Sequence, residues 1–289
     1  MEFNPEDDAK RYAENMLAKY LDPDEAKNRR DQYKSYQESA HSLEDKKFCR
    51  KAIQDLDDYI NSDELKEGKY PQGIDTLILE TIEWRALIYA FENVDTKRDP
   101  FKEHIFYDQW LVGGTYAIFC ILGKLVSRHN QDKSLRRLWT EVSHYIRRSG
   151  LCSKDEIEII DNKMNLEKGH FTNQNSSTMR FRNKAIAHNE SSPRVDWVEI
   201  DEDIKLLCRV WALITMWSSI GVFEPFRPSQ QAFSGLDSIF TPVEIRALAE
   251  QRNIYIEKVK SWCTHSLVDN SMVSKRSPFL KISVSTEVH

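Results

Sequence analysis

The sequence lacks the cysteine, histidine and glycine patterns that mark several functional classes. Its five cysteines are scattered through 289 residues, and no two form a Cys-x-x-Cys pair. An odd number of widely spaced cysteines argues against a disulfide framework, and the histidines show no HxxxH spacing for zinc. Neither GxGxxG nor GxxxxGKS/T is present, so a glycine loop that binds nucleotide phosphates is not supported. We therefore expect no metal and no cofactor.

The sequence also has little that resembles a secretion signal or a membrane span. Its first residues, MEFNPEDD, are acidic and contain no apolar run. The apolar stretches 110–126 and 206–223 are at the short end of the roughly 20 residues that a bilayer requires, and they contain Lys124 and Arg209 respectively. We expect both stretches to be buried core helices of a cytoplasmic protein that crosses no membrane.

The charge is unevenly distributed along the chain. A net charge of −5 argues against a nucleic-acid binder that relies on charge alone. Residues 1–103 contain 17 Lys and Arg against 25 Asp and Glu, whereas residues 124–150 contain seven basic residues against two acidic ones. The basic stretch is either a solvated helix face or a surface for phosphates. Its candidate phosphate-binding residues are Arg136, Arg137, Arg147 and Arg148.

Helix start and stop signals recur throughout the sequence. Four sites place an N-cap residue before a proline, and two segments, one of them at such a site, have capping-box spacing. The starts are Asn4-Pro5, Asp22-Pro23, Asp99-Pro100 and Thr241-Pro242; the boxes are Ser153–Glu156 and Thr241–Glu244; the stops are Gly68, Gly150 and Gly169. These signals predict helices near 5–20, 23–62 (with a break left open), 73–93, 100–129, 134–149, 154–167, 177–188, 201–222 and 242–265.

The predicted fold is therefore all-α. The first alternating pattern is at 279–288, which predicts either a short strand or a frayed tail. The polar composition of residues 23–47 predicts that they form an exposed N-terminal arm or pack on a partner, rather than lie in a core. Proline-containing turns near 93–100 and 224–235 suggest boundaries, so we predict an N-terminal helical region (1–98), a helical bundle (99–225), and a C-terminal helix and tail (226–289).

Three segments share a loose Arg–His spacing: Arg98–His104, Arg137–His144 and Arg182–His188. The spacing alone has little weight, because eight histidines produce such pairs by chance. The first segment contains a helix-capping Asp-Pro, and the second lies along one face of a basic helix, so both are interpreted as structural. The third, RNKAIAH, ends at NESSP, a cluster that stops helices. Its context makes it the candidate functional motif.

The geometry of a regular helix complicates this third motif. Residues six apart differ by about 240° of rotation and about 9 Å of rise, so Arg182 and His188 would not share a narrow face. Two arrangements would bring them together. Either the chain turns at His188, at the end of the helix, or a second copy of the segment completes the site across a two-fold axis.

The segment RNKAIAH, with apolar TYAIFCILGKLVS (115–127) before it and an apolar helix at 201–223 after it, resembles the HEPN superfamily, especially its abortive-infection branch. The resemblance covers about 105–225 and is interrupted by 150–176. It implies a helical bundle that dimerises so that two motifs face a common cleft, and metal-independent cleavage of RNA. Carried over, the catalytic residues are Arg182, Asn183 and His188, with Lys184 and Arg180 as candidate phosphate contacts.

These residue types suit that chemistry. RNA contains its own nucleophile, the 2′-hydroxyl, which needs a base to remove its proton, a cation to stabilise the charge on phosphorus, and an acid for the leaving 5′-oxygen. Histidine titrates near cellular pH, and the fork of arginine matches phosphate oxygens. Asn183 can donate to phosphate or hold His188 in one tautomer.

Two functions remain open from the sequence. The first is an endoribonuclease that acts as a toxin or phage-defence effector in the cytoplasm, as a homodimer, and that a neutralising or sensor protein can hold silent. The second is a non-catalytic HEPN-like module that binds a protein partner or a nucleotide and uses 182–188 structurally.

Overall fold

A computed structural model describes residues 6–17, 23–63, 73–96, 104–129, 132–172, 175–187, 195–218 and 232–268. Throughout these ranges the regular structure is helical and no strand is formed, so the predicted all-α class is confirmed. The predicted strand or tail at 279–288 lies outside the described residues.

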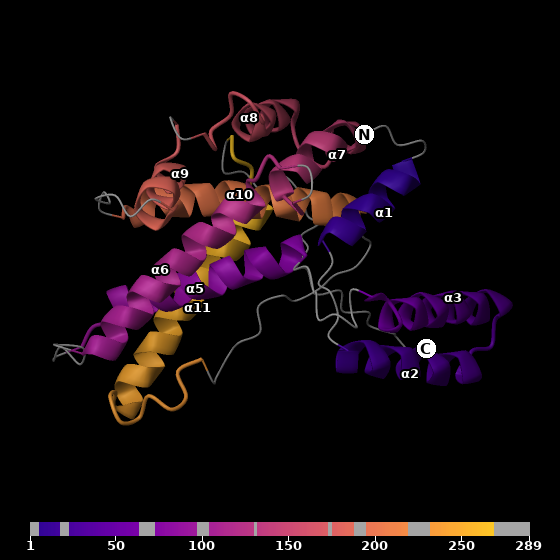
Figure 1. Cartoon of the computed structure of the whole chain (residues 1–289), viewed down its shortest axis with the longest axis horizontal. Coiled ribbons are helices and arrows are strands. Elements are labelled where there is room, and N and C mark those ends of the chain that lie inside the picture. Colours follow the sequence, from indigo (N-terminus) through magenta and orange to yellow (C-terminus); the bar gives the residue numbers. More distant parts are fainter. Residues whose placement is uncertain are drawn as a thin grey trace, which may run out of the picture. The chain divides into compact units, whose positions relative to one another are not determined.

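The chain divides into two compact units. The smaller, residues 18–73, contains α2 (Pro23–Ser39) and α3 (Leu43–Ile60). The larger contains all the other helices described (Figure 1). They are α1 (Glu6–Leu17), α5 (Ile74–Asn93), α6 (Ile105–Leu125), α7 (Leu135–Ser149), α8 (Lys154–Met164), α9 (Ser177–Phe181), the π-helix η1 (Arg182–Ala187), α10 (Trp197–Ser218) and α11 (Pro242–Thr264).

The smaller unit is a pair of helices with few buried side chains. The break left open in the predicted helix 23–62 lies between α2 and α3, where the side chain of Ser42 accepts a hydrogen bond of 2.9 Å from the backbone N–H of Asp45. Arg30 of α2 forms an ion pair of 3.2 Å with Asp57 of α3. Most side chains of this unit are exposed, as the polar composition of residues 23–47 predicts.

Helix α10 is the core of the larger unit. It packs against α1, α5, α7, α9 and α11, and most of its side chains are buried. The indole of Trp211 is fully buried, and its Nε1 donates a hydrogen bond of 2.7 Å to Asp75 of α5. Burial of each large apolar side chain contributes roughly 1.5–3 kcal/mol. The expectation of a core helix is confirmed for the described part of 206–223.

Helix α6 lies alongside α5 (Figure 1). Only one of its faces is buried. On the buried face Gly114 lets Trp84 of α5 approach, because a Cβ at 114 would lie 2.8 Å from the indole. The opposite face exposes apolar side chains. The prediction that 110–126 is a buried core helix is therefore confirmed for one face of the helix only. By length and composition α6 is also the one helix in the described ranges that could span a membrane, which for a single helix is weak evidence.

One of the predicted capping signals forms as expected, and two predicted helix starts differ in the structure. Thr241 and Glu244 form the full capping box at the start of α11. At α8, Ser153 accepts from the N–H of Glu156, but the Glu156 carboxylate turns into the core instead of back to the cap. Helix α6 begins at Ile105, with the His104 side chain as its N-cap, rather than at Pro100.

A buried ion pair joins three helices of the larger unit. Arg209 of α10 contacts both carboxylate oxygens of Glu156 in α8, at 2.9 and 3.0 Å, and donates to the carbonyl of Cys263 in α11. Both charged side chains are fully buried. Helices α1, α5 and α11 thus belong to the same unit as the bundle, so the predicted divisions at 98 and 226 do not coincide with the two units of the structure.

Candidate functional site

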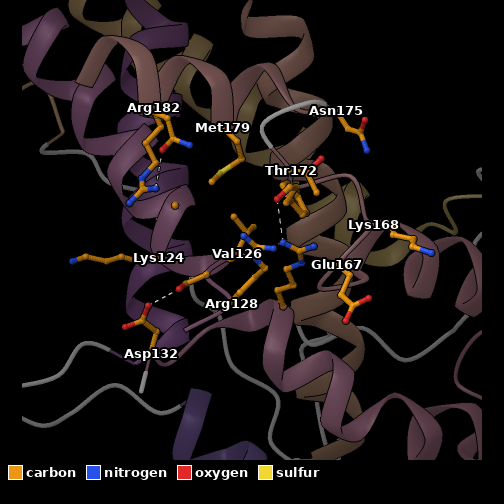
Figure 2. Close-up of a pocket in the computed structure, with 15 residues that line it drawn as sticks. Lys124, Val126, Arg128, Asp132, Glu167, Lys168, Thr172, Asn175, Met179 and Arg182 are labelled. Atoms are coloured by element: carbon orange, nitrogen blue, oxygen red, sulfur yellow. Dashed lines mark hydrogen bonds between the residues drawn. The ribbon is translucent and has the colours of Figure 1, made fainter. Parts of the chain in front are cut away.

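A basic pocket with a volume of about 790 Å³ lies beside the Arg182 segment (Figure 2). Its walls come from the end of α6 and the turn after it, the start of α7, the loop between α8 and α9, and the start of η1. Five of its lining residues are basic and two are acidic. They are Gly123, Lys124, Val126, Ser127, Arg128, Asp132, Arg136, Glu167, Lys168, Phe171, Thr172, Asn175, Met179, Arg182 and Asn183.

The side chain of Arg182 lies directly on the backbone of α6 at Gly123. A Cβ at position 123 would lie 2.6 Å from Cδ and 2.9 Å from Cζ of Arg182, so any larger residue there would displace the guanidinium. Asn183 accepts a hydrogen bond of 3.2 Å from Nη1 of Arg182 through its Oδ1. The amide of Asn183 therefore orients the guanidinium, a role that the sequence interpretation did not include.

The motif segment is a π-helix, where a regular α-helix was expected. Helix α9 ends at Phe181, and residues 182–187 form η1. A π-helix bonds residues five apart, so its turn is wider, and the rotation of 100° per residue no longer applies to this segment. The expectation that Arg182 and His188 point in different directions was calculated for an α-helix, and it does not apply to a π-helix. His188 itself lies outside the described residues.

Aromatic packing fixes the start of the motif. Phe181, the residue before Arg182, is buried and stacks on Phe119 of α6 with ring centroids 4.3 Å apart. At the other end of α9, Ser176 is the N-cap, accepting from the N–H of Met179. The short helix α9 is therefore held at both ends, which positions Arg182 at the pocket wall.

Asp203 of α10 anchors the loop that leads into α9. Its buried carboxylate accepts a hydrogen bond of 2.5 Å from the Thr178 hydroxyl and one of 3.4 Å from Ser176, and Nε2 of His170 lies 2.5 Å from it. Three residues of one segment thus share a single acceptor. No pattern in the sequence indicates this role, because an acidic residue within a polar helix start has many ordinary explanations.

Arg136 lines the pocket but is almost fully buried and does not project into solvent. Its guanidinium donates to the backbone carbonyls of Met164, Asn165, Phe171 and, more weakly, Val126. Burial, with a smaller contribution from the charge of Arg128, lowers the pKa of Arg136 to about 10. Arg136 therefore holds the 164–171 loop against α6 and α7, and its charge acts on the pocket.

The other predicted phosphate-binding residues of α7 do not line this pocket. Arg137 pairs with Glu141 at 3.4 Å, and Arg147 pairs with Asp161 of α8 at 2.6 Å. Arg148 acts on Glu6 of α1. The pKa of Glu6 is lowered mainly by the hydrogen bond from Trp217, and the charge of Arg148 is one of the smaller contributions. Eleven residues, about three turns, separate Arg136 from Arg147 and Arg137 from Arg148, so the two pairs lie about 16 Å apart along the helix axis. Arg180, just before the motif, and Lys184, within it, are exposed.

Three exposed cations complete the pocket: Lys124 and Arg128 at the end of α6, and Lys168 in the loop after α8. Within the described part of the chain, none of the three has a carboxylate at ion-pair distance. Arg128 and Lys124 belong to the basic stretch that the sequence indicates. Lys168 and Gly123 had no sequence signal, because their importance depends on what the fold brings beside them.

The two other Arg–His segments have the structural roles that were expected where they can be seen. His104 caps α6, and His144 is an exposed residue of α7 whose ring contacts that of Tyr145 at a tilt of 40°. Arg98 lies outside the described residues. In the ranges that the structure describes, no cluster of three His, Cys, Asp or Glu residues could hold a metal ion.

Comparison of the chain with protein-family models, curated proteins and solved structures gives no match. The functional assignment therefore depends on the residues of the chain and on the geometry of the pocket.

Proposed function

We propose that the chain is a metal-independent endoribonuclease of the HEPN type that cleaves RNA at the pocket beside Arg182. The observation that supports this best is the convergence of the motif residues Arg182 and Asn183 with Lys124, Arg128 and Lys168 on one cavity. Clefts lined by one sign of charge concentrate ligands of the opposite sign, and RNA carries one charge per phosphate.

The proposed reaction uses the nucleophile of the RNA itself. The 2′-oxygen forms a bond to phosphorus while the bond from phosphorus to the 5′-oxygen breaks. His188 takes the proton of the 2′-hydroxyl, and an acid returns a proton to the leaving 5′-oxygen. Arg182 binds the non-bridging oxygens, where charge accumulates in the transition state, and Asn183 keeps its guanidinium oriented. The products are a 2′,3′-cyclic phosphate and a 5′-hydroxyl.

The acid in this scheme comes from a second copy of the chain. No histidine is present among the described lining residues of the pocket. A second copy would supply a second His188 and a second Arg182, so that one histidine acts as base and the other as acid. The site in one chain is then incomplete, and a homodimer is the active form.

The exposed face of α6 is the surface we propose for this dimer. Ile105, Phe106, Val112 and Tyr116 are 43–77% exposed, and together with exposed Cys120 they form the α6 stripe. Exposed apolar patches of this kind mark interaction surfaces. The stripe runs along the helix towards Lys124, which lines the pocket. A second copy seated on it would therefore lie next to the site that it completes.

In the cell, such an enzyme would act as a toxin or as an abortive-infection effector in the cytoplasm. A neutralising or sensor protein would hold it silent until infection. Expression in a bacterial host should therefore arrest growth when no such partner is present. The arrest should disappear in Arg182→Ala and in His188→Ala.

The decisive experiment is an RNA cleavage assay with the purified protein. We expect cleavage in the presence of a chelator, with 2′,3′-cyclic phosphate and 5′-hydroxyl ends, and a loss of at least about 100-fold in Arg182→Ala and His188→Ala. His144→Ala is the matched control, because it removes an exposed histidine on α7. Undiminished cleavage by His188→Ala would overturn the proposal. Binding of nucleotide without any cleavage would favour the non-catalytic module.

A further inference from the structure

The pocket has a second wall, opposite the motif, which carries one cation and one carboxylate. Figure 2 shows Arg182 and Lys124 on one side and Lys168 with Glu167 on the other. This second wall is built by the loop between α8 and α9, within the 150–176 segment that interrupts the resemblance. Its composition is therefore a property of this chain.

Two cations of the pocket are not neutralised within the described residues: Lys168 on this wall and Arg128 in the turn after α6. Arg128 and Lys168 are exposed, and neither has a carboxylate at ion-pair distance there, whereas Arg137 and Arg147 of α7 each have one. The nearby carboxylate of Asp132 accepts a hydrogen bond of 2.5 Å from Ser127. Unpaired cations on a concave surface favour an anionic ligand.

A buried cation adds to this positive potential. The four acceptors of Arg136 are carbonyl groups, so its hydrogen bonds are satisfied while its charge is not. A buried charge without a counter-ion is costly, and an anion bound above it would offset part of that cost. The side chains that line the second wall, Thr172 and Asn175, can also donate hydrogen bonds to phosphate oxygens.

We propose that Arg128 and Lys168, above the buried charge of Arg136, form a second phosphate subsite, so that RNA is held at two successive phosphates. The Arg182 wall binds the phosphate that reacts, and the subsite of Arg128 and Lys168 binds a flanking phosphate of the same strand. The nature of the strand rests on the proposed ribonuclease function. The subsite itself can be tested without any cleavage.

The test measures binding of a 2′-O-methyl oligoribonucleotide, which has no nucleophilic hydroxyl, by fluorescence anisotropy at several salt concentrations. We expect Arg128→Ala and Lys168→Ala each to weaken binding by about tenfold and to reduce the salt dependence by about one released ion. Both side chains are exposed, so neither change should affect folding. Arg147→Ala removes the same charge where Asp161 already pairs with it, and should change the affinity by less than about twofold.

The outcomes separate this inference from the proposed function. Wild-type affinity in both Arg128→Ala and Lys168→Ala, with weaker binding in Arg182→Ala, would overturn the second subsite and leave the ribonuclease proposal intact. Binding that depends on Arg128 and Lys168 in a protein that cleaves no RNA would support the subsite and overturn the ribonuclease proposal. A wild-type protein that does not bind the oligonucleotide would overturn the subsite outright.

Discussion

The guanidinium of Arg182 lies against the backbone of Gly123 in the neighbouring helix α6, 59 residues earlier in the sequence. This contact exists only because position 123 has no side chain. It joins the motif to the exposed face of α6, where Lys124 is the next residue. The orientation of Arg182 therefore depends on α6 as much as on the segment that carries it.

Gly123→Ala should reduce RNA cleavage to the level of Arg182→Ala, because the added Cβ displaces the guanidinium. The double variant should be no worse than either single one, which a double-mutant cycle on kcat/KM would measure. Gly113→Ala on the same helix has open space at its Cβ and should raise the free energy of unfolding by about 0.5–1 kcal/mol. Additive losses in the double variant would show that the contact does not position Arg182.

Asp203→Ala should release the loop that forms the second wall of the pocket. The hydroxyls of Ser176 and Thr178 and the ring of His170 would lose their shared acceptor. Buried groups left unsatisfied cost about 1–3 kcal/mol each, so we expect a loss of about 2–4 kcal/mol in stability. Hydrogen exchange should become faster in residues 165–181. The control is Glu202→Ala, whose side chain is 66% exposed; equal destabilisation by both changes would contradict this role.

Asp75→Asn should stabilise the protein at neutral pH and leave its stability unchanged at low pH. Burial raises the pKa of Asp75 from 3.8 to about 6, although the hydrogen bond from Trp211 opposes the shift. A raised pKa means that this group's contribution to stability is fully present below about pH 4 and is lost as the pH rises through 6. Two pKa units correspond to about 2–3 kcal/mol. Asparagine keeps the acceptor for Trp211 without the charge.

The measurement for Asp75→Asn is urea unfolding of both proteins between pH 3.5 and pH 8. The difference in the free energy of unfolding should be near zero at pH 3.5 and reach its full value above pH 7. A difference that does not vary with pH would show that Asp75 does not titrate with a raised pKa.

Cys120 offers a direct test of the dimer, because it is the one exposed cysteine of the five. Labelling with a maleimide should be fast for dilute protein and should slow at concentrations where the α6 stripe is covered by a second copy. Tyr116→Arg should prevent dimer formation, so labelling should stay fast at high protein concentration and the protein should sediment as a monomer. RNA cleavage should be impaired. Val243→Arg on α11, also an exposed apolar position, should behave as wild type. Labelling independent of concentration in a monomeric wild-type protein would rule out the proposed interface.

Local chemistry in the sequence predicts most of the helices. The Thr241–Glu244 box, the proline that follows Thr241, and Gly150 with its positive φ act within one turn of chain, so each can be identified without knowledge of the rest of the fold. The apolar content of 206–218 likewise predicts a buried helix, because no exposed helix is apolar on every side. The all-α class follows from these signals.

Only the tertiary structure decides the site. Arg136, Arg137 and Arg147 are equivalent in sequence, yet one is buried among carbonyls and the other two pair with carboxylates. Arg137 points about 100° away from Arg136, whereas Arg147 shares the face of Arg136 but lies about three turns further along the helix, within reach of α8. Glu156 has the spacing of a cap but pairs with Arg209, since a buried cation outweighs a backbone amide at a helix start. The π-helix at 182–187 and the fit of Arg182 on Gly123 depend on contacts between distant segments, which no local pattern encodes.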